Sequence, residues 1–199
     1  EKAVTVLTKG VEFLFKKNKV TYFKGIGAFK KDNEISISAN GKETIIQTNK
    51  TIISTGSGPA SLPGMEFDEK QILSSTGALS LREVPKKMVV VGGGYIGLEM
   101  GSVWSRLGTQ VEVIEFLDHI TPGMDSEISK EFEKILKKQG IKFQLNTKVE
   151  KITKNKNFVS IDTVDKEKNK NKIQADVVLI SVGRKPNTKG LNLKNVGVQ

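Results

Sequence analysis

The sequence predicts an α/β protein built on a parallel sheet with crossover helices, and three observations lead to this prediction. Between residues 88 and 145, short apolar stretches alternate with longer stretches in which apolar residues recur at helical spacing. A glycine-rich turn, G-x-G-x-x-G, joins the first apolar stretch to the first helical one. The motif I-S-x-G-x-x-P ends an apolar stretch twice, at 53–59 and 180–186. Strands that alternate with helices form parallel sheets, because each helix carries the chain back to the edge where the next strand begins.

The first third of the chain predicts a helix followed by antiparallel strands. Apolar residues at helical spacing indicate a helix over 1–17, from Val4 to Phe15. Alternating residues, many of them β-branched, then predict three strands, at 20–29, 34–38 and 43–54. A loop rich in glycine and proline follows, and residues 60–85 are predicted to be irregular, with a domain boundary among them.

The second part reads as strand, helix, strand, helix, strand. The three strands are predicted at 88–91, 111–115 and 141–145. The first helix runs through Ile96 and Leu107 and ends at Gly108, where glycine stops a helix readily. The second opens at Asp125 or Ser126, whose side chain can cap free N–H groups. An antiparallel excursion at about 149–173 and a last buried strand at 176–183 complete the pattern.

The glycine turn has the features of a Rossmann-like dinucleotide site. Gly92 permits the tight turn, Gly94 lets a pyrophosphate approach the backbone, and Gly97 lets helix and strand pack closely. The start of the following helix offers free N–H groups and a partial positive charge to phosphates. Glu115, 18 residues after Gly97, ends the next strand and can accept hydrogen bonds from the ribose of an adenosine.

Glu115 also favours NAD over NADP, because its carboxylate would repel a 2′-phosphate and no arginine follows it in the segment 115–125. Two alternatives stay open: the glycines serve only the turn, or Glu115 merely ends a strand and faces water. The two copies of I-S-x-G-x-x-P look like the closing strands of two related dinucleotide domains, of which only the second has its glycine-rich opening in this chain.

The composition excludes several kinds of site. The chain has no cysteine, so it holds no disulfide scaffold, thiolate zinc site or cysteine nucleophile. Its single histidine, His119, excludes a histidine metal cluster, and no metal site is predicted. No apolar run approaches the roughly 18 residues that cross a membrane, and no secretory leader is visible. A chain that starts at Glu1 without methionine is expected to be a piece of a longer protein.

The net charge of +10 raises the alternative of a non-enzymatic, basic module that binds nucleic acid. Such a module would need clustered arginines and exposed aromatic residues, whereas the arginines here are scattered, at Arg82, Arg106 and Arg184. The lysines, including the densest run at 165–172, are predicted to form a solvated surface. Trp104 is predicted to pack in the core rather than to stack on a ligand.

Four strings carry a resemblance to a known family: "SSTGALSL", "GGGYIGLEMGSVWSRLGTQVEVIEFLDHI", "EISKEFEKILKKQGIKFQLNTKV" and "LISVGRKPNT". Together they resemble the flavin disulfide oxidoreductases, and within them the dihydrolipoamide dehydrogenase group, over nearly the whole chain. The resemblance implies that 1–79 is the interior part of an FAD-binding domain. It also implies that 80–199 is an inserted NAD-binding domain and the start of the return to the first. In this group electrons pass from dihydrolipoamide to a cysteine pair, then to FAD and to NAD⁺.

The resemblance also assigns site residues. Its NAD contacts fall on Gly92, Gly93, Gly94, Tyr95, Ile96, Gly97, Leu98, Glu99, Glu115, Val149 and Gly183. Its FAD contacts fall on Gly27, Thr55, Gly56 and Ser57, so the FAD site is expected to be incomplete in this chain. No catalytic residue can be assigned, because the cysteine pair and the family's histidine base fall outside the chain. His119 is not that base.

The resemblance implies that the full-length enzyme is a homodimer that acts on the lipoyl groups of 2-oxo acid dehydrogenase complexes. It also implies a compartment, which is the mitochondrial matrix in a eukaryote or the cytoplasm in a bacterium. Nucleic acid and membrane are not expected as partners, and the fragment alone is expected to be inactive. A sibling flavoprotein, such as an NADH oxidase or a glutathione-type reductase, stays open as an alternative.

Overall fold

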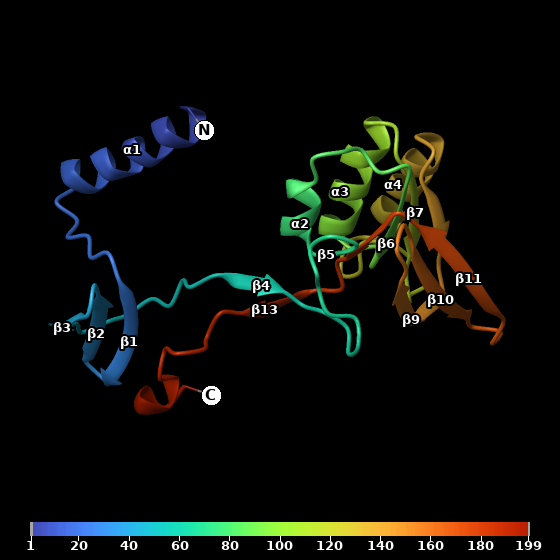
Figure 1. Ribbon diagram of the computed structural model, residues 1–199. Coiled ribbons are helices and arrows are strands. Elements are labelled where there is room, and N and C mark those ends of the chain that lie inside the picture. The colour runs from blue at the N-terminus through green and yellow to red at the C-terminus, as the bar shows by residue number, and fades with distance from the viewer. Residues whose placement is uncertain (1, 199) are drawn as a thin grey trace. The chain divides into compact units, whose positions relative to one another are not determined.

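A computed structural model describes residues 2–198. The chain divides into two compact units (Figure 1). The first comprises the residues up to Gly56 together with those from Asn187 onward, and the second spans Ser57–Pro186. The predicted domain boundary at 79/80 lies inside the second unit. The assignment of the two parts to FAD- and NAD-binding domains stays a prediction.

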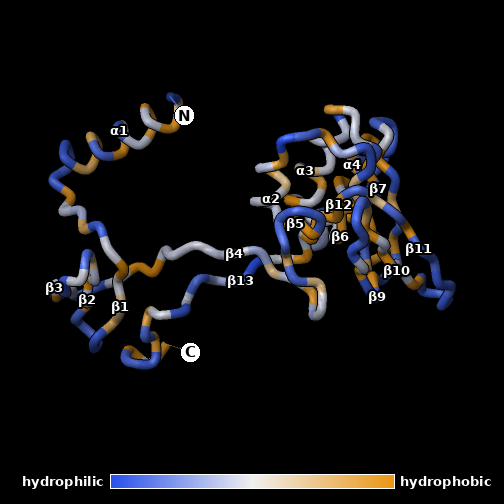
Figure 2. Tube along the Cα trace, in the orientation of Figure 1, coloured by the Kyte–Doolittle hydropathy of each residue, from blue (hydrophilic) through white to orange (hydrophobic). Residues whose placement is uncertain are grey.

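The first unit contains a helix, a small antiparallel sheet and a short 3-10 helix. Their bounds are α1 Lys2–Lys17, β1 Ile26–Lys31, β2 Glu34–Ala39, β3 Lys42–Gln47 and η1 Leu193–Val196. The strands lie in the order β1-β2-β3, and both neighbouring pairs are antiparallel. Phe29 and Ile37 are the buried apolar residues of this sheet. No residue of α1 is buried, although apolar residues recur along it (Figure 2).

The predicted helix is confirmed, but two of the three predicted strands are shorter than expected. Residues 20–25 and 48–54 are not in strands. Ile52, which the apolar pattern places inside a strand, is 90% exposed. A strand persists only where a neighbour pairs with its N–H and C=O groups. The pairing ends with the bond from the Thr48 N–H to the Asn33 carbonyl, and in the described part of this unit no strand lies beside residues 49–54.

The second unit is built on a five-stranded parallel sheet in the order β5-β12-β6-β7-β8. The bounds of these strands are β5 Ile72–Leu73, β6 Lys87–Val91, β7 Gln110–Ile114, β8 Lys142–Gln144 and β12 Val177–Ile180. The helices are α2 Ser75–Ser80, α3 Tyr95–Arg106 and α4 Ser126–Lys138. An antiparallel sheet follows α4 and β8, made of β9 Thr147–Lys154, β10 Val159–Asp165 and β11 Lys170–Ala175. The predicted α/β class with a parallel sheet and an antiparallel excursion is confirmed.

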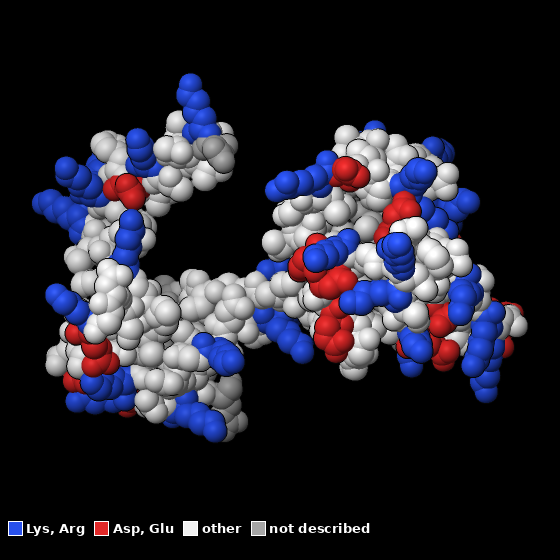
Figure 3. Space-filling view, in the orientation of Figure 1, with Lys and Arg blue, Asp and Glu red and all other residues white. Residues whose placement is uncertain are grey.

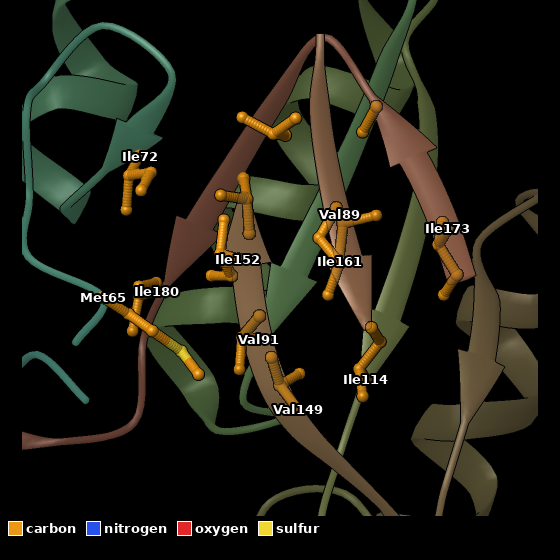
Figure 4. Close-up of a cluster of buried hydrophobic side chains, with 13 residues drawn as sticks. Met65, Ile72, Val89, Val91, Ile114, Val149, Ile152, Ile161, Ile173 and Ile180 are labelled. Atoms are coloured by element: carbon orange, nitrogen blue, oxygen red, sulfur yellow. The ribbon is translucent and has the colours of Figure 1, made fainter. Parts of the chain in front are cut away.

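Both faces of the parallel sheet are covered, one by helices and the other by the antiparallel sheet. Successive residues of a strand point to opposite faces. Met88 and Val90 of β6 accordingly pack with Leu98 and Trp104 of α3. Val89 and Val91 pack on the opposite face, among the residues that the antiparallel sheet contributes (Figure 4). Those residues are Val149, Ile152, Val159, Ile161, Ile173 and Ala175.

The packing face of α3 does not follow all of its apolar residues. Val103, in the last turn, and Leu107, the C-cap, are 45% and 55% exposed. The buried residues of the helix are Gly97, Leu98, Gly101 and Trp104. Glycines let the helix backbone approach the sheet, so the face that packs is lined partly by residues that carry no apolar side chain. The prediction that Trp104 packs in the core is confirmed.

Two helix starts show how local side chains set boundaries. The Asp125 carboxylate accepts hydrogen bonds from the N–H groups of Glu127 and Ile128, so Asp125 is the N-cap of α4, as predicted. Ser74 caps α2 in the same way. Helix α2 lies within residues 60–85, which were predicted to be irregular. At six residues it is too short for periodicity to reveal it.

The two copies of I-S-x-G-x-x-P meet each other. Their ends form β4 Ser57–Pro59 and β13 Arg184–Pro186, which pair in antiparallel register, Arg184 opposite Pro59. Upstream of this ribbon the second copy belongs to β12 in the parallel sheet, as predicted. The corresponding part of the first copy, residues 53–56, is not in a strand, so the predicted closing strand is absent there.

Within residues 2–198, none of the helices is long and apolar enough to cross a membrane. The same part of the chain contains no group of three or more acidic or histidine side chains placed to hold a metal ion. Lysines and arginines lie dispersed over the visible face of each unit, with acidic residues between many of them (Figure 3).

Candidate nucleotide-binding site

A hollow of about 630 Å³ lies in the second unit, where three parallel strands end. Val91, Ile114 and Ile180 are the last residues of β6, β7 and β12, and all three line it. Parallel strands deliver their carboxyl ends to one edge of the sheet, where loops with free backbone groups follow. The hollow is therefore in the position that ligands occupy in open α/β sheets, and its volume is in the range of small-molecule sites.

The glycines of the turn differ in what surrounds them. Gly92 has a φ of +103°, and a methyl group there would come 2.6 Å from the carbonyl oxygen of Ser181. On Gly97 a methyl group would overlap the Gly92 carbonyl and the Ser181 hydroxyl. On Gly94 it would meet nothing within 4 Å. Gly92 and Gly97 are thus required by the protein's own packing, whereas Gly94 keeps open a space that the protein does not fill.

Helix α3 begins at this open space. Its N-cap is Gly94, which has no side chain to satisfy the first N–H groups of the helix. Gly94, Tyr95 and Ile96 all line the hollow. An uncapped helix start carries a partial positive charge and free donors, so this end of the hollow suits an anionic group such as a phosphate.

Glu115 also lines the hollow; it comes directly after β7 and is only 8% exposed. Its Oε2 accepts a hydrogen bond from the N–H of Gly93 at 2.6 Å, and its Oε1 accepts one from the N–H of Leu117 at 2.8 Å. A carboxylate has about four acceptor sites, so two bonds hold it in place and leave capacity for a ligand hydroxyl. Glu115 therefore does not merely face water.

The structure brings together seven of the eleven residues predicted to contact NAD. Those that line the hollow are Gly92, Gly94, Tyr95, Ile96, Glu115, Val149 and Gly183. The other four do not line the hollow. Gly93 is buried in the turn, Gly97 is buried in the helix, Leu98 is in the core, and Glu99 is exposed. Their roles toward a nucleotide stay predictions.

Two of the four residues predicted to contact FAD line the same hollow. Gly27 and Thr55 line a second hollow, of about 160 Å³, in the first unit. Gly56 does not line it, and Ser57 belongs to the other unit. The Thr55 hydroxyl donates to the carbonyl of Asn187 at 2.7 Å. A hollow of this size is below the range of small-molecule sites, and the roles of the four residues toward FAD stay predictions.

Several residues that line the 630 Å³ hollow were missed by the sequence analysis. Lys148 and Arg184 add two cations to its wall, next to the predicted Val149 and Gly183. The Arg184 guanidinium donates to the hydroxyl and the carbonyl of Ser57, which ties it to the ribbon of β4 and β13. The others are Pro59, Leu62, Ser75, Val91, Ile114, Phe116, Thr121, Pro122, Met124, Thr147, Ile180, Ser181 and Val182.

His119 stands apart from the site. Its Nδ1 lies 2.6 Å from Oδ1 of Asp118, both side chains are exposed, and neither lines the hollow. The hydrogen bond from His119 lowers the pKa of the Asp118 carboxyl. This pair is a local surface contact.

The family model described as pyridine nucleotide-disulphide oxidoreductase matches residues 2–199. The chain belongs to the pyridine nucleotide-disulphide oxidoreductase family.

Several members of the family are similar over the whole chain. A mitochondrial dihydrolipoyl dehydrogenase of Pisum sativum is 53% identical, and a dihydrolipoamide dehydrogenase of Chaetomium thermophilum is 52% identical. A leghemoglobin reductase of Glycine max is 51% identical. Each match covers 100% of this chain, and the chain spans 40%, 40% and 38% of the length of these relatives.

Solved structures of flavoprotein disulfide reductases have the same fold. LpdA from Mycobacterium tuberculosis matches 88% of this chain and 39% of its own with a TM-score of 0.76 and 25% identity. The HOCl-induced flavoprotein disulfide reductase RclA from Escherichia coli matches 100% of this chain and 46% of its own with a TM-score of 0.74 and 28% identity. The family is named for a pyridine nucleotide and a disulphide. The hollow beside α3 has an uncapped helix start and a buried carboxylate, two features that suit a nucleotide.

Proposed function

We propose that this chain is the nucleotide-binding portion of a dihydrolipoyl dehydrogenase and that it binds NAD in the hollow beside α3. The observation that carries the proposal is the open space at Gly94, in a hollow that is lined both by an uncapped helix start and by a buried carboxylate. A dinucleotide needs those two features, because its pyrophosphate is anionic and its ribose presents paired hydroxyl groups.

In this arrangement the pyrophosphate sits over Gly94 and accepts hydrogen bonds from the first N–H groups of α3. Lys148 and Arg184 add positive charge at the wall of the hollow. Glu115 accepts hydrogen bonds from the ribose hydroxyls of the adenosine, and its charge disfavours a 2′-phosphate. When bound, the nicotinamide ring supplies a hydride acceptor, and the residues of this chain orient it.

For the whole enzyme we propose oxidation of dihydrolipoamide, with electrons passing through a cysteine pair and FAD to NAD⁺. Residues 1–79 would then be the interior part of the FAD-binding domain, and 80–199 the NAD-binding domain with the start of the return. Gly27, Thr55, Gly56 and Ser57 would contribute to an FAD site that other parts of the enzyme complete. The relatives named dihydrolipoyl dehydrogenase support this proposal.

We further propose that the enzyme acts as a homodimer on the lipoyl groups of 2-oxo acid dehydrogenase complexes. The mitochondrial relatives of plants and Dictyostelium discoideum support the mitochondrial matrix for a eukaryotic source, and the Pseudomonas putida relative supports the cytoplasm for a bacterial one.

A nucleotide titration tests the proposal. NADH and NADPH are titrated by fluorescence against the 199-residue chain and against Glu115→Gln. The chain should bind NADH more tightly than NADPH. The variant should lose about ten- to hundredfold in NADH affinity, as expected for one charged hydrogen bond of about 1.5–3 kcal/mol. Its NADPH affinity should change little, because removing the charge also removes the repulsion.

Glu112→Gln is the matched control, because Glu112 lies on β7, three residues before Glu115. It does not line the hollow, and its carboxylate pairs with Lys87 at 3.0 Å. The control should bind NADH like the parent. Equal affinity of the parent chain for the two nucleotides, unchanged in Glu115→Gln, would show that Glu115 does not select the cofactor. Absence of NADH binding by the parent chain would refute the proposed site.

A further inference from the structure

Thr121, at the wall of the hollow, adopts a backbone conformation that its residue type disfavours. Its φ is +51°, in the left-handed region, and it is buried. β-branched side chains rarely adopt this conformation. Thr121 also precedes Pro122, and a residue before proline is restricted to extended conformations with negative φ. Such a residue persists only where surrounding contacts compensate for the strain.

Hydrogen bonds hold Thr121 on three sides. Its N–H donates to the carbonyl of Gly93 at 2.9 Å, and its own carbonyl accepts from the N–H of Met124 at 3.1 Å. Its hydroxyl lies 2.7 Å from the hydroxyl of Ser129, on α4, and 2.8 Å from the carbonyl of Ile120. A hydroxyl can accept one hydrogen bond while it donates another. Ser129 can therefore donate to Thr121 while Thr121 donates to Ile120.

The contact with Gly93 ties this strained residue to the glycine turn. The N–H of Gly93 donates to the Glu115 carboxylate, and the carbonyl of Gly93 accepts from the N–H of Thr121. Both backbone groups of Gly93 are thus bonded to the same short segment, residues 115–121. A methyl group on Gly93 would come within 3.3 Å of Glu115 and of Ile120, so the segment also packs closely on it. Gly93 directly precedes Gly94, the N-cap of α3. The direction of the helix start therefore depends on where residues 115–121 hold Gly93.

We propose that the Thr121–Ser129 hydroxyl pair is a positioning device for the nucleotide site. The pair keeps Thr121 in its left-handed conformation, in which its N–H reaches the Gly93 carbonyl. That contact fixes the turn so that the first N–H groups of α3 point into the hollow. Ser129 does not line the hollow, so it acts on the nucleotide only through Thr121. This inference rests on the proposed binding of NAD.

The test compares NADH affinity and the free energy of unfolding for a set of variants of the 199-residue chain. Thr121→Val keeps the branched side chain and loses the hydroxyl. Ser129→Ala removes the partner hydroxyl and leaves Thr121 unchanged. Thr121→Ser keeps the hydroxyl on a less crowded side chain, and Thr121→Gly removes both hydroxyl and strain. Thr163→Val is the control, because Thr163 is buried in the antiparallel sheet, donates to the Asn171 carbonyl and does not itself line the hollow.

Thr121→Val and Ser129→Ala should each lower NADH affinity about three- to tenfold, the effect of one ordinary hydrogen bond. Their double variant should lose no more than Thr121→Val, because both changes remove the same contact. Thr121→Ser should bind like the parent, and Thr121→Gly should lose less affinity than Thr121→Val because glycine adopts positive φ without strain. Thr163→Val should lose stability without losing NADH affinity.

Hydrogen exchange provides a readout that does not depend on the nucleotide. Exchange of the Thr121 amide, which donates to Gly93, should be faster in Ser129→Ala than in the parent and unchanged in Thr163→Val. If Thr121→Val and Ser129→Ala fold and bind NADH like the parent, the hydroxyl pair only stabilises the fold and the positioning proposal is wrong. If the parent itself binds no NADH, the proposed function is wrong and the positioning proposal falls with it.

Discussion

Gly94 and Gly97 of the G-x-G-x-x-G motif are needed for different reasons, and substitutions at the two positions should have different effects. Gly94 faces open space in the hollow, whereas Gly97 faces the Gly92 carbonyl and the Ser181 hydroxyl. A side chain at Gly94 would therefore exclude a ligand, and one at Gly97 would disturb the contact between helix and sheet.

We expect Gly94→Val to abolish measurable NADH binding while it changes the free energy of unfolding by less than about 1 kcal/mol, the scale of an N-cap substitution. Gly97→Ala should lower the free energy of unfolding by about 1–3 kcal/mol, as overpacking of a close contact does. Urea unfolding and fluorescence titration of both variants measure the two effects. A folded Gly94→Val variant that binds NADH like the parent would mean that the glycine turn is only structural.

Among the elements, the turn that leads into β5 depends on one carboxylate. Oδ1 of Asp68 accepts hydrogen bonds from the N–H groups of Lys70, Gln71 and Ile72 at 2.8–3.0 Å. Its Oδ2 lies 3.1 Å from the ammonium of Lys154 on β9. Partial burial acts to raise the pKa of Asp68, but these hydrogen bonds, that of Ile72 foremost, outweigh it and hold the pKa well below its usual range.

The depressed pKa makes a prediction about pH. A carboxylate whose pKa is lower in the folded than in the unfolded chain stabilises the fold above the unfolded value, near 4, and this stabilisation is lost as the pH falls through the folded value. Asp68→Asn should cost about 1–3 kcal/mol at pH 7 and progressively less below about pH 4. Urea unfolding from pH 7 to pH 2 measures both curves. A constant difference between parent and variant over this range would contradict the role of Asp68, and NADH affinity should be the same in both.

At the scale of the whole molecule, both large clusters of buried side chains belong to the second unit. One lies between the two sheets and the other between the parallel sheet and the helices, and every member of either falls within Ser57–Pro186. The 630 Å³ hollow is lined by residues of this unit alone. A unit with its own core and its own site can fold and bind by itself.

We therefore expect a protein of residues 57–186 to unfold cooperatively and to bind NADH within about twofold of the full 199-residue chain, a difference of less than about 0.5 kcal/mol. Thermal unfolding followed by circular dichroism, with NADH titration, compares the two. A piece that lacks a cooperative transition, or that binds NADH tenfold more weakly, would show that the first unit supports the site.

The class of the fold and the centre of the site could be read from the sequence because their signals are local. A strand, a G-x-G-x-x-G turn and a helix follow one another directly, and Asp125 caps α4 from the residue next to it. Glu115 could be predicted as a residue of the candidate site because, in the strand–turn–helix–strand pattern, the acidic residue is expected at the end of the second strand. These features depend on hydrogen bonds and backbone angles of neighbouring residues, which the sequence alone specifies.

Only the tertiary structure showed which surfaces these elements share. The antiparallel sheet packs on one face of the parallel sheet, and α3 packs on the other partly through its glycines. Neither contact can be read from a local pattern, because burial depends on partners far away in the chain. The sequence predicted that Glu115 accepts hydrogen bonds from a ribose. The structure shows that its carboxylate also accepts a hydrogen bond from the N–H of Gly93. The left-handed Thr121 left no signal in the sequence, since threonine before proline predicts an extended backbone. Contacts from the glycine turn and from α4 impose that conformation, and these contacts exist only once the chain has folded.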